Sequence, residues 1–176
     1  MRSANILRAS IFAIAAAFLI FNQDHSVSVG TTVIQFVTAG IAFGGLVLIK
    51  TESTSNRSVI IVPSAIAAFV LGLTFLFSSG GTAESNLAVF TGFIAILAGG
   101  TAIAEFVFSR QATGGDKLEL RISSSIGILA AIVFWLAPLD ALNAVGFFSA
   151  YLSVSAVQLA IWAAAPKKKE QSIGKS

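Results

Sequence analysis

Residues 87–108 read LAVFTGFIAILAGGTAIAEFVF and hold one ionisable side chain, that of Glu105. As an α-helix this stretch would extend about 33 Å, and the hydrocarbon core of a bilayer is about 30 Å thick. Ala95 and Gly99 are four residues apart and therefore share one face of that helix. Small side chains on one face let a second helix approach closely. The stretch therefore predicts a membrane-spanning helix that packs against other helices.

The composition of the whole chain agrees with this prediction. Of its 176 residues 56% are hydrophobic and only 11% are charged, whereas a soluble domain is about a quarter charged. In a bilayer this composition is favourable, because side chains that face lipid are apolar. We predict an all-α polytopic membrane protein with a transmembrane domain over residues 1–166 and a basic, disordered tail over 167–176. The expected helices are 4–21, 31–49, 59–77, 87–108, 122–136 and 142–165.

The basic residues predict the orientation of these helices. All 11 lysines and arginines lie at the N-terminus, around the connections 50–58 and 109–121, or in the tail. The remaining connections carry acidic side chains instead, those of Asp24, Glu84 and Asp140. Since positive charge accumulates on the cytoplasmic side, we expect both termini in the cytoplasm of a bacterial cell, with the chain in the plasma membrane. The lysines of the tail are expected to contact anionic lipid: Lys167, Lys168 and Lys169.

Small residues recur in the expected helices at a spacing of four. The six helices read as three hairpins, and in each hairpin both helices carry such a pair or triplet of Ala, Gly or Ser. This pattern favours a threefold internal repeat and close helix crossings, although a chain so rich in small residues also produces such matches by chance. The glycines predicted to pack between helices are Gly40, Gly44, Gly72, Gly99 and Gly127.

Three polar side chains inside the expected helices are candidates for function. Glu105 is the only carboxylate there, and an intramembrane acid is a functional candidate by default. It lies about one turn from Arg110, so we expect it to reach the membrane interface, remain ionised and tolerate replacement. Arg8 is likewise expected to extend to the headgroups. Gln35 and Gln158 are expected to bridge helices by hydrogen bonds, with ligand binding as the alternative.

Several kinds of chemistry have no support in the sequence. The chain has no cysteine and a single histidine, His25, which falls in an expected loop beside Asp24. Nucleotide-binding and hydrolase motifs such as the Walker loop, H-E-x-x-H and G-x-S-x-G are absent from the sequence. We therefore expect a protein that is not an enzyme, binds no cofactor, metal or nucleic acid, and has the lipid bilayer as its main partner.

The three hairpins, the small-residue stripes and the turn at Ala137-Pro138 resemble the HdeD-like family of small bacterial membrane proteins. The resemblance extends from Ile6 to Ala165. It implies a plasma-membrane protein with a role in acid resistance or another stress response, and it carries over no catalytic residues. Two alternatives remain open: a small transporter or channel subunit, and an interaction subunit that forms a homo-oligomer or joins a larger membrane complex through its small-residue faces.

Overall fold

The computed structural model describes residues 2–51, 57–77 and 81–165, and in these residues it contains helices and no strand. Each helix is long and apolar enough to cross a membrane. The predicted all-α fold with six spans is therefore confirmed, and the chain is an integral membrane protein. The helices are α1 (Arg2–Phe21), α2 (Val27–Thr51), α3 (Arg57–Phe77), α4 (Ala83–Ser109), α5 (Gly114–Leu136) and α6 (Ala141–Ala164).

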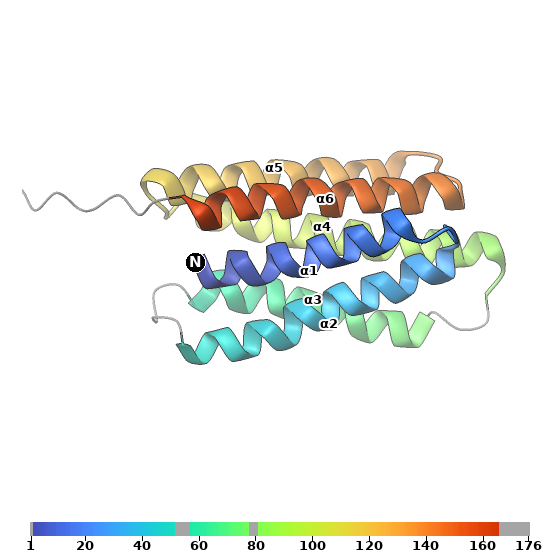
Figure 1. Cartoon of the computed structure of the whole chain (residues 1–176), viewed down its shortest axis with the longest axis horizontal. Coiled ribbons are helices and arrows are strands. Elements are labelled where there is room, and N and C mark those ends of the chain that lie inside the picture. Colours follow the sequence, from blue (N-terminus) through green and yellow to red (C-terminus); the bar gives the residue numbers. More distant parts are fainter. Residues whose placement is uncertain (1, 52–56, 78–80, 166–176) are drawn as a thin grey trace, which may run out of the picture.

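Successive helices run in opposite directions along one bundle (Figure 1). The N-terminus, the end of α6 and the turn from α4 to α5 lie at the same end, on the left of the figure. The end of α2 and the start of α3 lie there too. We call this end the basic end, because the described lysines and arginines belong to the helix segments that meet there: Arg2, Arg8, Lys50, Arg57, Arg110, Lys117 and Arg121.

The helices follow their chain order around the bundle, and α6 closes the ring by packing against α1. The most extensive contacts join α2 to α3, α4 to α5, and α6 to α1. In addition α2, α4 and α6 contact one another and so form the centre. This arrangement is compatible with a threefold repeat of hairpins. Moving every helix label forward by two converts the pair α2–α3 into α4–α5, and α4–α5 into α6–α1. The second helix of each hairpin therefore packs mainly against the first helix of the next hairpin.

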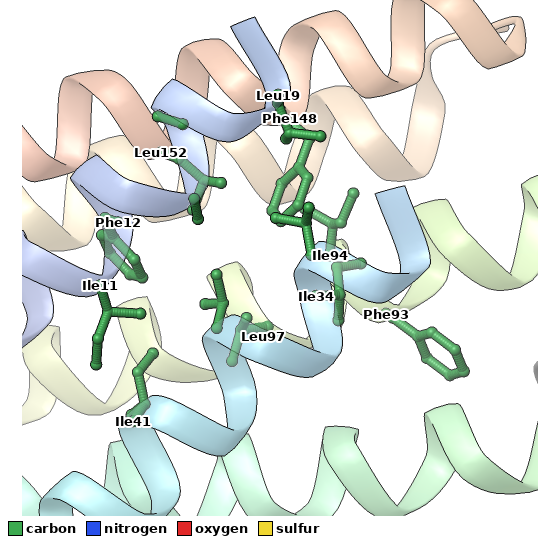
Figure 2. Packing of buried hydrophobic residues seen from close by; sticks show 14 of the residues in the cluster. Ile11, Phe12, Leu19, Ile34, Ile41, Phe93, Ile94, Leu97, Phe148 and Leu152 are labelled. Atoms are coloured by element: carbon green, nitrogen blue, oxygen red, sulfur yellow. The ribbon is translucent and has the colours of Figure 1, made fainter. Parts of the chain in front are cut away.

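Large apolar side chains fill the centre of the bundle. Phe90 and Phe148 are fully buried, and their rings meet edge to face with 5.9 Å between centroids. Ile34, Ile94 and Leu152 are buried around them (Figure 2). The outer surface is also apolar, with side chains such as those of Phe, Leu and Ile exposed along every helix. An apolar exterior around an apolar core is what a bilayer environment requires.

The start of α5 differs from the sequence prediction. Residues 109–121 were expected to form a charged loop, but α5 begins at Gly114, which has a φ of +58°. Asp116, Lys117, Glu119 and Arg121 therefore lie on the first two turns of a helix. The prediction failed because a hydropathy criterion counts charged residues as loop. A helix that leaves the hydrocarbon core continues through the headgroup region, where charged side chains are well solvated.

Side-chain caps account for the starts of α4 and α6. Thr82 Oγ1 accepts a hydrogen bond from the backbone N–H of Ser85 at 3.3 Å, so α4 begins four residues before the predicted 87. Asp140 Oδ1 accepts one from the N–H of Asn143 at 2.7 Å at the start of α6. Such caps satisfy N–H groups that the first turn of a helix leaves free.

Candidate functional site

A buried ion pair joins α1 to α4 near the basic end. Arg8 Nη1 donates a hydrogen bond to Glu105 Oε1 at 2.7 Å. The side chain of Glu105 is only 3% exposed and that of Arg8 is 16% exposed. The expectation that both side chains extend to the membrane interface is therefore wrong. An ionised carboxylate inside a bundle requires a cation nearby, and Arg8 supplies it from a position 97 residues away in sequence.

The position of Glu105 follows from the buried stripe of α4. Ala98, Thr101 and Ala102 are buried, and Glu105 and Ser109 continue the same spacing of three and four residues. Glu105 therefore faces the bundle although it lies one turn from the helix end. Its sequence neighbour Arg110 does not pair with it but stacks over the Phe106 ring, with the guanidinium carbon 5.2 Å from the ring centroid.

A second carboxylate is buried beside the ion pair. Asn5 Nδ2, one turn before Arg8 on α1, donates a hydrogen bond to Glu119 Oε1 of α5 at 2.5 Å. Asn5 is 6% exposed and Glu119 is 7% exposed. Sequence analysis missed both residues, because it placed Glu119 in a loop and Asn5 at the very start of a helix. Two consecutive turns of α1 thus hold α4 and α5 by polar contacts.

Tyr151 of α6 completes this group. Its ring lies against that of Phe12, with 6.3 Å between the ring centroids. Tyr151 is close enough to Arg8 and Glu105 to interact with both electrostatically. We call Asn5, Arg8, Glu105, Glu119 and Tyr151 the basic-end cluster. It draws on four of the six helices, α1, α4, α5 and α6.

The cluster borders a small cavity of about 30 Å³, lined by Asn5, Arg8, Glu105, Glu119, Ser64 and Ser123 among others. A volume of this size accommodates one or two water molecules, since one water molecule needs a cavity of about 10–15 Å³. Arg8 Nε is buried and has no hydrogen-bond partner among the described residues. With both carboxylates ionised, the cluster carries one more negative than positive charge.

The two glutamines lie elsewhere. Gln35 of α2 lines a hollow of about 280 Å³ toward the opposite end of the bundle, together with Thr31, Thr32 and Asn86. Gln158 of α6 lines an open apolar groove of about 590 Å³ between α5 and α6. Its Nε2 atom is buried and, within the described part of the chain, unpartnered. The three polar candidates of the sequence are therefore not brought together.

Four of the five predicted glycines lie against another helix. A Cβ atom added to Gly40 would come within 2.9 Å of the Ile11 side chain, and one at Gly44 would collide with Leu7. One at Gly99 would lie 3.1 Å from Ala131 Cβ. The closest approach to another backbone is at Gly127, where it would lie 2.9 Å from the Ala98 carbonyl oxygen.

Gly72 differs from the others, because no described atom lies within 4 Å of its added Cβ. Sequence analysis also missed Gly45, whose Cβ would overlap the hydroxyl of Ser64. Ser64 Oγ donates to the carbonyl of Ile60 at 2.8 Å and is 3.3 Å from that of Ile41, so it joins α3 to α2. Close crossings in this bundle thus include a hydrogen bond as well as small side chains.

The remaining candidates are the lysines of the tail and His25. Lys167, Lys168 and Lys169 lie outside the described residues. His25 Nδ1 lies 3.3 Å from the carbonyl oxygen of Gln23 in the connection between α1 and α2. In the described ranges no three His, Asp or Glu side chains are grouped so as to hold a metal ion.

Comparison of the chain with protein-family models, with curated proteins and with solved structures finds no match. The comparisons therefore add no support to the resemblance to the HdeD-like family.

Proposed function

We propose that the chain is a non-enzymatic membrane protein of the bacterial plasma membrane that helps the cell tolerate acid stress. The observation that carries the proposal is the basic-end cluster, with Arg8 and Glu105 paired at 2.7 Å inside the bundle. Stability alone does not explain such a pair. Replacing a buried ion pair by apolar residues of similar volume often leaves the free energy of unfolding unchanged or raises it. Retention of charge inside a bilayer protein therefore favours a functional role.

The link to acid comes from the chemistry of the cluster. Besides histidine, carboxylates are the side chains whose charge changes as the pH falls below neutrality, and two carboxylates meet here beside one guanidinium. Both carboxylates are within two turns of the basic end. Glu105 precedes Ser109, the last residue of α4, and Glu119 follows Gly114, the first residue of α5. If the basic end faces the cytoplasm, as the positive-inside rule favours, the cluster responds to acidification of the cell interior.

The transporter alternative has less support. Phe90 is fully buried. So are Phe148, Ile34, Ile94 and Leu152, which Figure 2 shows packed in the interior of the bundle. A solute path through this packed region would require a different conformation. The interaction-subunit alternative has less support as well, because four of the five glycines predicted to pack between helices lie against helices of the same chain.

The test is survival of the source bacterium after acid exposure. We expect deletion of the gene to lower survival, and the wild-type gene to restore it. A gene carrying Arg8→Met and Glu105→Leu together should not restore survival, although these substitutions remove both partners of the ion pair at once. Full survival with the double variant, or no effect of the deletion, would contradict the proposal. Solute flux through proteoliposomes of the purified protein would favour the transporter instead.

A further inference from the structure

We propose that the basic-end cluster is a binding site for one proton, with Glu119 as the group that takes it up. The inference deepens the proposed function and rests on it only for its physiological meaning, because the site is defined by geometry. Its starting point is the excess of carboxylates: two buried carboxylates, Glu105 and Glu119, share one buried cation, Arg8.

The two carboxylates have different partners, and this difference selects Glu119. Glu105 receives a charged hydrogen bond from Arg8 at 2.7 Å. Glu119 receives its described hydrogen bond from the neutral amide of Asn5. A guanidinium donor adds the attraction of its positive charge to the hydrogen bond, whereas a neutral amide donor does not. When one proton enters the cluster, it therefore leaves the Arg8–Glu105 pair intact and binds Glu119.

The charged groups around Glu119 agree with this choice. Glu105 of α4 and Asp116 of its own helix are close enough to repel a charge on Glu119. Arg8 of α1 is the cation that attracts it, but it is already bonded to Glu105. Tyr151 of α6 interacts with Arg8 and Glu105. A neutral Glu119 thus removes two repulsions and one weaker attraction.

The cavity gives the protonated group a partner. Its volume of about 30 Å³ accommodates one or two water molecules between Glu119, Ser123 and Arg8. A protonated carboxyl donates one hydrogen bond, and a water molecule in this cavity is a suitable acceptor. The same water can accept the hydrogen bond of Arg8 Nε, which has no partner among the described residues. Proton uptake forms one O–H bond on Glu119 and releases no other group.

The experiment is infrared difference spectroscopy of the purified full-length protein in lipid nanodiscs, titrated from neutral to acid pH. We expect the C=O band of a buried protonated carboxyl to appear in the wild type and to be missing in Glu119→Gln. The matched control is Glu84→Gln, since Glu84 is an exposed carboxylate at the opposite end of α4. Its band should equal that of the wild type.

A second variant keeps the carboxyl and alters its environment. Asn5→Leu removes the amide that stabilises the ionised form, so the band should appear at a higher pH than in the wild type. A band that persists in Glu119→Gln would overturn the proposal, and so would an Asn5→Leu titration identical to that of the wild type. A band suppressed by sodium ions at constant pH would assign the cavity to a metal cation instead. None of these outcomes depends on acid survival, so the site and its physiological role are tested separately.

Discussion

Glu105 shows how one side chain can be misjudged from its distance to a helix end. One turn from the end of α4, it was expected to reach the interface, and instead it is bonded to Arg8 across the bundle. We therefore expect Glu105→Gln to destabilise the protein, by up to about 3–5 kcal/mol, because it removes the carboxylate bonded to the Arg8 guanidinium and leaves only the more distant charge of Glu119 nearby. The measurement is unfolding of the purified protein in mild detergent.

The control for this prediction is Glu84→Gln, which removes an exposed carboxylate from the same helix and should shift stability by less than about 0.5 kcal/mol. The double variant Arg8→Met, Glu105→Leu should recover part of the lost stability, since it removes both charges of the pair together and leaves Glu119 with its hydrogen bond from Asn5. Equal melting of Glu105→Gln and the wild type would restore the interfacial interpretation of Glu105.

Contacts between distant residues explain why sequence analysis did not find the cluster. The partners Arg8 and Glu105 are 97 residues apart, and Asn5 and Glu119 are 114 apart. Neither pair has a local motif. The sequence did contain one usable signal, the three- and four-residue spacing that extends from Ala98 and Thr101 to Glu105. That spacing places Glu105 on the packed face, whereas its distance from the helix end does not.

At the level of the helices, the expectations were most accurate where composition alone decides. Six long apolar stretches predicted six spans, and the structure has six helices that are able to cross a membrane. The predicted start of α5, at residue 122, was eight residues later than the observed start at Gly114. The prediction was wrong because charged side chains on a helix resemble a loop in a hydropathy profile. Which helices pack most closely was beyond prediction, since small residues occur on many faces.

Helix crossings provide a matched pair of substitutions. Gly127→Ala places a Cβ 2.8 Å from Ala102 Cβ and 2.9 Å from the Ala98 carbonyl oxygen, so α4 and α5 must move apart. We expect the free energy of unfolding to fall by about 1–3 kcal/mol, as it does when extra methyl groups are forced into other packed sites. Gly72→Ala meets no described atom within 4 Å and adds helix propensity, so it should be neutral or stabilising by up to about 1 kcal/mol.

The measurement for this pair is again unfolding in mild detergent, with both alanine variants expressed and purified in parallel. Both substitutions add one methyl group to a helical glycine, so a difference between them reports the neighbouring helix and not the residue type. Similar stabilities for the two variants would contradict the close α4–α5 crossing at Gly127.

The six helices of the described residues form a ring, with the basic side chains gathered at one end and apolar side chains in the interior. This asymmetry has a functional consequence under our proposal. The two carboxylates of the basic-end cluster are within two turns of the helix ends on one side, whereas the buried Phe90 and Phe148 lie toward the other end of α4 and α6. A protein built in this way is suited to report the pH of one compartment, and only its orientation decides which compartment that is.

Orientation can be measured directly, because the chain contains no cysteine and a single introduced one gives no background. Gln23 is exposed between α1 and α2, and Gln111 is exposed at the basic end between α4 and α5. With the basic end in the cytoplasm, Gln23→Cys should react with a membrane-impermeant maleimide in intact cells, and Gln111→Cys only after lysis. Both positions are polar and exposed, so neither substitution disturbs packing. The reverse labelling pattern would show that the basic end faces the outside of the cell. The cluster would then respond to the pH of the outer side. Labelling of both positions in intact cells would contradict the alternation of six spans.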